Sequence, residues 1–99
     1  MNINEWVKEY RETQGAMLLD VRMPSEYAAG HIPGSVNVPL SELGRTQRQV
    51  PAYETPLYVY CTVGMRAQMA VEQLTGAGYV NAVNIGGIMD YAGELEQQR

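Results

Sequence analysis

The sequence has one cysteine, one histidine and no phenylalanine among its 99 residues. One cysteine cannot form an internal disulfide, and one cysteine with one histidine supplies too few ligands for a structural zinc site. The apolar runs are also far shorter than the roughly 20 residues that a membrane-spanning helix needs. Packing alone must therefore hold the fold together, and we expect neither a metal site nor a membrane span.

Basic residues are scarce as well: Lys and Arg number 7 while Asp and Glu number 11, which gives a formal net charge of −4. A chain with this charge is not expected to bind a nucleic-acid backbone or an anionic membrane. Hydrophobic residues make up 45% of the chain, so residues 1–99 should form one small domain with a buried core. The N-terminus lacks the basic and apolar segments of a signal peptide, which makes a reducing cytoplasm the expected location.

Segments with helical and strand-like periodicity alternate along the chain. Helices are expected at residues 3–10, 24–30, 40–50, 67–77 and 89–97, and the clearest strands at residues 17–21, 35–38, 57–60 and 80–85. This alternation predicts an α/β fold with a small, open and mostly parallel sheet of five strands flanked by helices. Open parallel sheets bind ligands at the carboxyl ends of their strands, where Asp20 and Cys61 lie.

Cys61 lies between the strongest strand and the strongest helix of the sequence, at the start of a short loop. Backbone amides converge in such a strand-to-helix loop, and together with the helix dipole they favour a thiolate over a thiol. Arg66 adds a positive charge to this loop, and Gly64 allows the loop to curl. The segment therefore predicts a nucleophilic sulfur beside an anion-sized cradle. The alternative is that Cys61 is a small buried side chain without chemistry of its own.

Three segments in the same order resemble the rhodanese homology domain, and the resemblance as a whole extends over residues 3–95. The segments are residues 18–22 with 26–40 (LLDVR and EYAAGHIPGSVNVPL), residues 58–66 (YVYCTVGMR) and residues 84–88 (NIGGI). Three motifs in this order are more specific than a single short pattern. The family resemblance implies the α/β fold predicted above and a sulfur-transfer activity.

The resemblance also implies roles for individual residues. Cys61 would accept a sulfane sulfur and become a persulfide, while Arg66 would face the anionic donor. Asp20 would support the loop through hydrogen bonds, and Arg22 would lie near the same rim. The backbone amides that would bind the outer sulfur run from Thr62 to Arg66 and include those of Val63, Gly64 and Met65.

The implied reaction moves sulfur from thiosulfate or a persulfide donor to cyanide, a thiol or a protein thiol, without a metal or organic cofactor. Because Cys61 is the sole cysteine, an external acceptor must remove the sulfur. One rival is a small phosphatase or arsenate reductase, but four residues separate Cys61 from Arg66, one fewer than in relatives that bind phosphate or arsenate. The other rival is a carrier that holds a persulfide without turnover.

Several other residues have two possible interpretations. His31 either forms a dyad with the cysteine or has a structural role, and its position in a turn favours the structural role. Gly86 and Gly87 either hold a phosphate or allow a close backbone approach, and the lack of a further glycine or lysine favours the close approach. Met65 and Met69, one helical turn apart, either form an apolar lip beside the thiol or fill the core.

Overall fold

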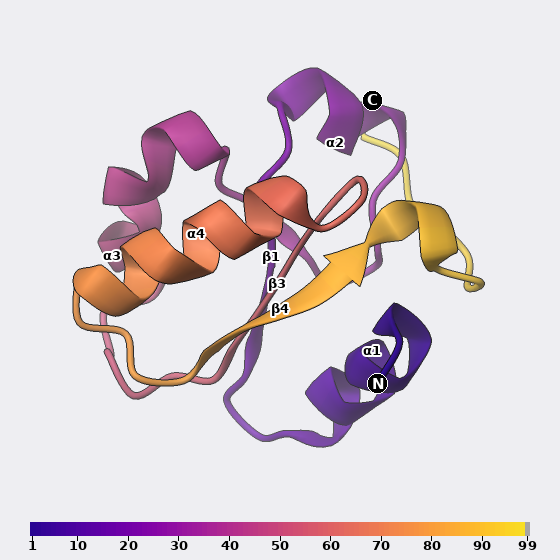
Figure 1. The fold of residues 1–99 in the computed structure, drawn as a ribbon. Helices are drawn as coiled ribbons and strands as arrows, with labels where there is room; N and C mark the ends of the chain where they lie inside the picture. The colour runs from indigo at the N-terminus through magenta and orange to yellow at the C-terminus, as the bar shows by residue number, and fades with distance from the viewer. Residues whose placement is uncertain (99) are drawn as a thin grey trace.

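The computed structural model describes residues 1–98, which form a parallel sheet between two layers of helices (Figure 1). The α-helices are α1 (Ile3–Glu12), α2 (Pro24–Ala29), α3 (Thr46–Gln49) and α4 (Met65–Gly76). The strands are β1 (Met17–Asp20), β2 (Val36–Asn37), β3 (Leu57–Cys61) and β4 (Ala82–Gly87). Two 3₁₀ helices complete the elements: η1 (Leu40–Arg45) and η2 (Ile88–Asp90).

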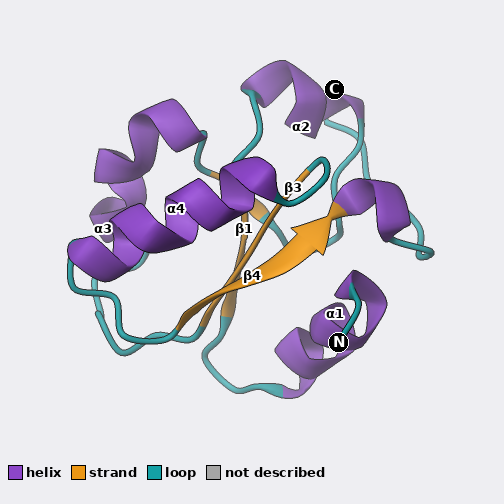
Figure 2. Cartoon of the chain, in the orientation of Figure 1, coloured by secondary structure: helices purple, strands orange, loops and turns teal. Residues whose placement is uncertain are grey.

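The sheet has the strand order β2-β1-β3-β4, and every pair of neighbouring strands is parallel. Figure 2 labels three of these strands, β1, β3 and β4. The register of β3 against β4 shifts between Val59 and Tyr60, because Val59 pairs with Asn84 whereas Tyr60 pairs with Gly86. One residue of β4 therefore bulges, and the bulge increases the local bend of the strand. After the bulge, Gly87 pairs with Cys61 at the carboxyl end of β3.

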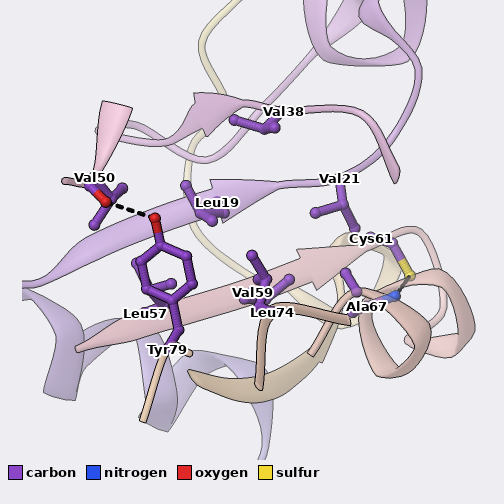
Figure 3. Packing of buried hydrophobic residues seen from close by; sticks show 11 residues of the cluster. Leu19, Val21, Val38, Val50, Leu57, Val59, Cys61, Ala67, Leu74 and Tyr79 are labelled. Carbon is purple, nitrogen blue, oxygen red and sulfur yellow. Dashed lines mark hydrogen bonds between the residues drawn. The ribbon is translucent and has the colours of Figure 1, made fainter. Parts of the chain in front are cut away.

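Alternating side chains of the strands supply a separate core on each face of the sheet. Leu19 and Val59 belong to the cluster that packs against α4, and Figure 3 shows Cys61 at one end of this cluster. Leu18 and Tyr58 belong to the cluster that packs against α1. All five residues of β3 are buried, as expected for a central strand of a parallel sheet covered on both faces.

The predicted α/β class and the parallel sheet are confirmed, but two details of the prediction are wrong. Residues 1–98 contain four strands in the sheet and not five. The predicted helix at residues 89–97 is replaced by the short η2 and an extended segment, in which Glu96 forms an antiparallel bridge with His31. Gly93 weakens the helical tendency of this segment, and backbone hydrogen bonds to His31 take the place of those of a helix.

Smaller differences concern the ends of elements. Residues 40–50 are helical as predicted, but they form η1 and the short α3 and no continuous α-helix. The last strand extends through Gly87, two residues beyond the predicted end. No helix within residues 1–98 combines the length and the apolar character that crossing a membrane requires.

Tyr60 connects the centre of the sheet to the segment that follows α2. Its hydroxyl accepts a hydrogen bond from the backbone N–H of Ile32 (3.1 Å) and donates one to the Oγ of Ser35 (3.1 Å). Burial is the main reason why the pKa of Tyr60 is raised, so the phenol stays protonated at neutral pH.

We expect Tyr60→Phe to lower the free energy of unfolding by about 1–3 kcal/mol, because the buried N–H of Ile32 loses its partner. Urea unfolding followed by circular dichroism measures this change. Tyr53→Phe is the matched control: Tyr53 is exposed, and the structure gives its hydroxyl no hydrogen bond among residues 1–98. Its effect should stay within about 0.5 kcal/mol. Equal effects of the two substitutions would contradict the assigned role of Tyr60.

Candidate functional site

Cys61 ends β3 directly beneath the loop that leads into α4, and only 1% of the residue is exposed. Its Sγ accepts hydrogen bonds from the backbone N–H groups of Gly64 (3.0 Å) and Ala67 (3.3 Å). Figure 3 shows the sulfur beside Ala67. Donors of this kind stabilise negative charge on sulfur, and the N-terminus of α4 adds its partial positive charge. The arrangement suits a thiolate.

The conformation of the loop requires glycine at two positions. Gly64 precedes α4 with a φ of +105°, in the left-handed region that side chains with a Cβ rarely adopt. Gly87 at the end of β4 lies so close to the loop that a Cβ there would overlap the carbonyl oxygen of Thr62 and the Cα of Val63. The interpretation of the Gly86–Gly87 pair as a close backbone approach is therefore confirmed.

The side chain of Asn84 connects the loop to β4 through hydrogen bonds. Its Nδ2 donates to the carbonyl oxygen of Gly64 (3.1 Å), and its Oδ1 accepts from the N–H of Gly86 (2.9 Å). The N–H of Met89 also donates to the carbonyl oxygen of Thr62 (3.3 Å). Two carbonyl groups of the loop, those of Thr62 and Gly64, are thus bonded outward to η2 and β4, while the amides of Gly64 and Ala67 are directed at the sulfur of Cys61.

Arg66 forms a bidentate ion pair with Glu26 of α2. The Nη1–Oε1 distance is 2.7 Å and the Nη2–Oε2 distance is 3.1 Å, and Nη2 also donates to the hydroxyl oxygen of Thr62 (2.8 Å). The hydrogen bonds from Arg66 are the main cause that lowers the pKa of Glu26 to about 2. The pKa of Arg66 is raised, chiefly through its hydrogen bond to Glu26. At neutral pH the positive charge expected to face the donor is therefore already paired with a carboxylate.

Asp20 and Arg22 form a second, more deeply buried pair. Arg22 Nη2 lies 2.7 Å from the Oδ2 of Asp20 and 2.7 Å from the carbonyl oxygen of Gly30. Burial opposes the charge of Arg22, but the hydrogen bonds and the negative charge of Asp20 outweigh it, so the pKa of Arg22 is raised. This pair connects the end of β1 to the end of α2.

The prediction that Asp20 supports the loop through hydrogen bonds is wrong. Among the described residues, the carboxylate of Asp20 accepts hydrogen bonds only from Arg22. The contact between β1 and the end of β3 is instead made by backbone, through the N–H of Val21 and the carbonyl oxygen of Tyr60 (3.1 Å). Arg22 does line a hollow with Thr62 and Glu26, but its guanidinium is bound to Asp20 and Gly30.

The sequence left two interpretations open for His31, Met65 and Met69. The Nδ1 of His31 lies 2.8 Å from the carbonyl oxygen of Tyr27, and its ring stacks on the Tyr27 ring with centroids 3.8 Å apart. These contacts favour a structural role. Met65 and Met69 are 74% and 51% exposed, so the interpretation that they fill the core is wrong. They lie on the surface at the start of α4.

Two site residues, Glu26 and Asn84, lie in the segments that carry the family resemblance, but sequence reasoning gave them no role. Glu26 carries a local signal: it is the third residue of α2, and its Oε1 also accepts from the N–H of Met23 (2.9 Å), as in a capping box. That signal predicts a helix start, but it does not reveal an ion pair with a residue 40 positions away. Asn84 carries no local signal, because its partner in the loop is 20 positions distant.

The ionisation of Glu26 makes stability depend on pH. The pKa of Glu26 is about 2 in the folded protein and 4.5 ordinarily, so the ion pair stabilises the fold above pH 4.5. This stabilisation is lost as the pH falls from about 4.5 towards 2. Because the side chains of Arg66 and Glu26 are 35% and 34% exposed, solvent screens the pair and its contribution is about 0.5–1 kcal/mol.

We therefore expect the wild type to lose about 0.5–1 kcal/mol more unfolding free energy than Glu26→Gln when the pH is lowered from 6 to 3. Urea titrations at each pH measure the difference, and glutamine retains an acceptor for the N–H of Met23. Identical pH dependence of the two proteins would contradict the assigned ion pair.

Comparison with known proteins identifies the family. The chain is 37% identical over 75 residues to the thiosulfate sulfurtransferase PspE of Escherichia coli (strain K12), a match that covers 75% of this chain and 72% of PspE. It is 33% identical over 91 residues to the adenylyltransferase and sulfurtransferase uba4 of Ogataea parapolymorpha. That match covers 91% of this chain and only 23% of uba4, so the chain spans less than a quarter of the length of this relative.

A solved structure described as rhodanese with anions from E. coli aligns with a TM-score of 0.78 at 34% identity, over 83% of this chain and 98% of that chain. The family model of the rhodanese-like domain matches residues 4–94. This range includes the sheet, the loop after Cys61 and both ion pairs. The chain belongs to the family of rhodanese-like domains.

Proposed function

We propose that this protein transfers a sulfane sulfur from thiosulfate or a persulfide to a thiol, cyanide or a protein thiol, through a persulfide on Cys61. The observation that carries the proposal is the position of the Cys61 sulfur, which accepts hydrogen bonds from Gly64 and Ala67 at the N-terminus of α4. The name of PspE, a thiosulfate sulfurtransferase, supports the same class of reaction. A reducing compartment such as the cytoplasm would keep the thiol free.

In the first step the Cys61 thiolate attacks the outer sulfur of the donor. A new S–S bond forms while the S–S bond of the donor breaks, and sulfite or a thiolate leaves with the bonding electron pair. In the second step the acceptor attacks the outer sulfur of the persulfide, and Cys61 leaves as a thiolate. Amide donors stabilise the charge on sulfur in both states, so neither step requires a local base.

The remaining site residues hold this loop in place. The amides of Thr62, Val63, Gly64 and Met65 are the proposed contacts of the outer sulfur. Arg66 closes the loop through its hydrogen bond to the hydroxyl of Thr62. Asp20 and Arg22 act farther away, because their pair joins the ends of β1 and α2 next to Thr62 and Glu26.

Phosphate chemistry is the weaker alternative. Four residues lie between Cys61 and Arg66, so the ring of amides is small for a tetrahedral phosphoryl group. The pairing of Arg66 with Glu26 also leaves little positive charge for a phosphate dianion. Hydrolysis of an aryl phosphate that depends on Cys61 would favour this alternative.

A persulfide carrier needs the same loop as an enzyme, and one observation keeps it as a second candidate. The chain has no second cysteine that could release the sulfur from Cys61. Turnover of thiosulfate and cyanide distinguishes the two functions, because a carrier without turnover stops at one sulfur per chain. An enzyme that works by double displacement gives parallel double-reciprocal plots.

Incubation with thiosulfate or a small organic persulfide should raise the intact mass of the protein by one sulfur atom, because Cys61 holds the transferred sulfur. Cys61→Ser should show no increase, since it is the sole cysteine. Mass spectrometry of the intact chain measures both proteins. Absence of the adduct with both donors would contradict the proposed function.

Gly87→Ala should slow sulfur loading of Cys61 by at least about tenfold, because the new Cβ displaces the backbone of Thr62 and with it the amides of the loop. Gly76→Ala is the matched control, since a Cβ at Gly76 meets no atom within 4 Å. Loading is followed by intact mass, and circular dichroism establishes that both variants fold. Equal loading rates in the two folded variants would show that the close approach does not govern the site.

A further inference from the structure

The basic residues around the loop are all paired with carboxylates. Residues 62–65 carry no charged side chain. In the described part of the chain, the hollows beside the loop are lined by only two basic residues, Arg66 and Arg22. Arg66 is paired with Glu26, and Arg22 is paired with Asp20. The net charge of these four side chains is zero at neutral pH, so the approach to Cys61 offers no unpaired guanidinium to an incoming anion.

Glu26 binds the two Nη atoms of Arg66, which are the donors that a substrate anion would use. Nη1 donates to the Oε1 of Glu26 at 2.7 Å, and Nη2 donates to its Oε2 at 3.1 Å. The third short contact of this fork goes to the hydroxyl of Thr62 (2.8 Å). A dianionic donor must therefore either displace the carboxylate of Glu26 or bind beside it, and both cost free energy through lost hydrogen bonds or like-charge repulsion.

The surroundings of the loop are apolar instead. Val63 and Met65 line the hollow next to Gly86, while Met23 lines a second hollow with Arg66. Met89 lines a third hollow with Thr62 and Glu26. The side chains of Val63, Met65, Met23 and Met89 are all exposed. Thioethers and aliphatic groups contact uncharged organic groups and soft sulfur atoms well, whereas they contribute nothing to holding a dianion.

We infer that Glu26 determines donor specificity: by pairing with Arg66 it disfavours dianionic donors such as thiosulfate and favours persulfides carried on uncharged organic groups. This inference rests on the proposed function and narrows its donor class. For such a donor, the Cys61 thiolate attacks the outer sulfur of R–S–SH, the S–S bond of the donor breaks, and R–S⁻ leaves while Cys61 becomes Cys–S–SH. Glu26 takes no part in bond making and acts through the charge of Arg66.

The experiment compares the second-order rate constants with which thiosulfate and 2-hydroxyethyl persulfide load sulfur onto Cys61, measured by intact mass in the full chain. Glu26→Gln keeps an acceptor for Arg66 and Thr62 but removes the negative charge. The ratio of the thiosulfate rate to the persulfide rate should rise about tenfold in Glu26→Gln. This rise should shrink at high salt, because ions screen the charge of Arg66.

Two control variants separate the local charge of Glu26 from the geometry of its side chain and from the net charge of the protein. Glu26→Asp retains the charge with a shorter side chain, so its ratio should stay within about threefold of the wild type. Glu54→Gln changes the net charge equally, but it lies in the connection before β3, at the opposite end of the sheet from the loop, and should leave the ratio unchanged. A general effect of net charge would move both glutamine variants alike.

The outcomes distinguish this inference from the function on which it rests. If both donors load the wild type and the ratio does not rise in Glu26→Gln, the sulfur-transfer function stands and the role of Glu26 is overturned. A loss of loading with both donors in equal proportion would make Glu26 a purely structural residue and would also overturn the inference. If neither donor loads the wild type, the proposed function itself fails.

Discussion

The contact between the end of β4 and the loop after Cys61 is the constraint on which the site depends. The bulge in β4 brings Gly86 and Gly87 opposite Tyr60 and Cys61, and the missing side chain at Gly87 lets the loop backbone pass directly above the strand. The carbonyl groups of Thr62 and Gly64 are then bonded outward to Met89 and Asn84, while the amides of Gly64 and Ala67 donate to the sulfur of Cys61. The bulge, Gly87 and Asn84, all in β4, therefore control the geometry at the end of β3 together with Met89 of η2.

Charge compensation is the second constraint. Each of the two arginines of the site forms an ion pair with a carboxylate. Arg22 pairs with Asp20 at the end of β1, and Arg66 pairs with Glu26 of α2. Buried or half-buried guanidinium groups require such partners, because an unpaired charge in this setting is costly. The same pairing that stabilises the fold neutralises the charge of Arg66, so the donor specificity that we infer is coupled to stability through Glu26.

Much of the fold could be predicted from local patterns, because each strand and helix carries its own periodicity. The apolar run that became β3 and the stripe of small residues on α4 are examples, and both elements lie close to the expected ranges. The predicted helix at residues 89–97 does not form, because backbone pairing of Glu96 with His31, which is distant in the sequence, outweighs the weak helical tendency around Gly93. Residues 40–50 form a 3₁₀ helix and a short α-helix, a division that the periodicity of the sequence did not predict.

The sequence by itself determined the location of the candidate site: one cysteine, at the end of the strongest strand and before the strongest helix, with an arginine closing a short loop. Spacing along the chain is enough for this, since a strand, a turn and a helix are local structures. Only the tertiary structure decided the charge of the site, because the partner of Arg66 is a glutamate from another helix. Ion pairs across 40 residues depend on how the helices pack against the sheet, and no local pattern encodes that arrangement.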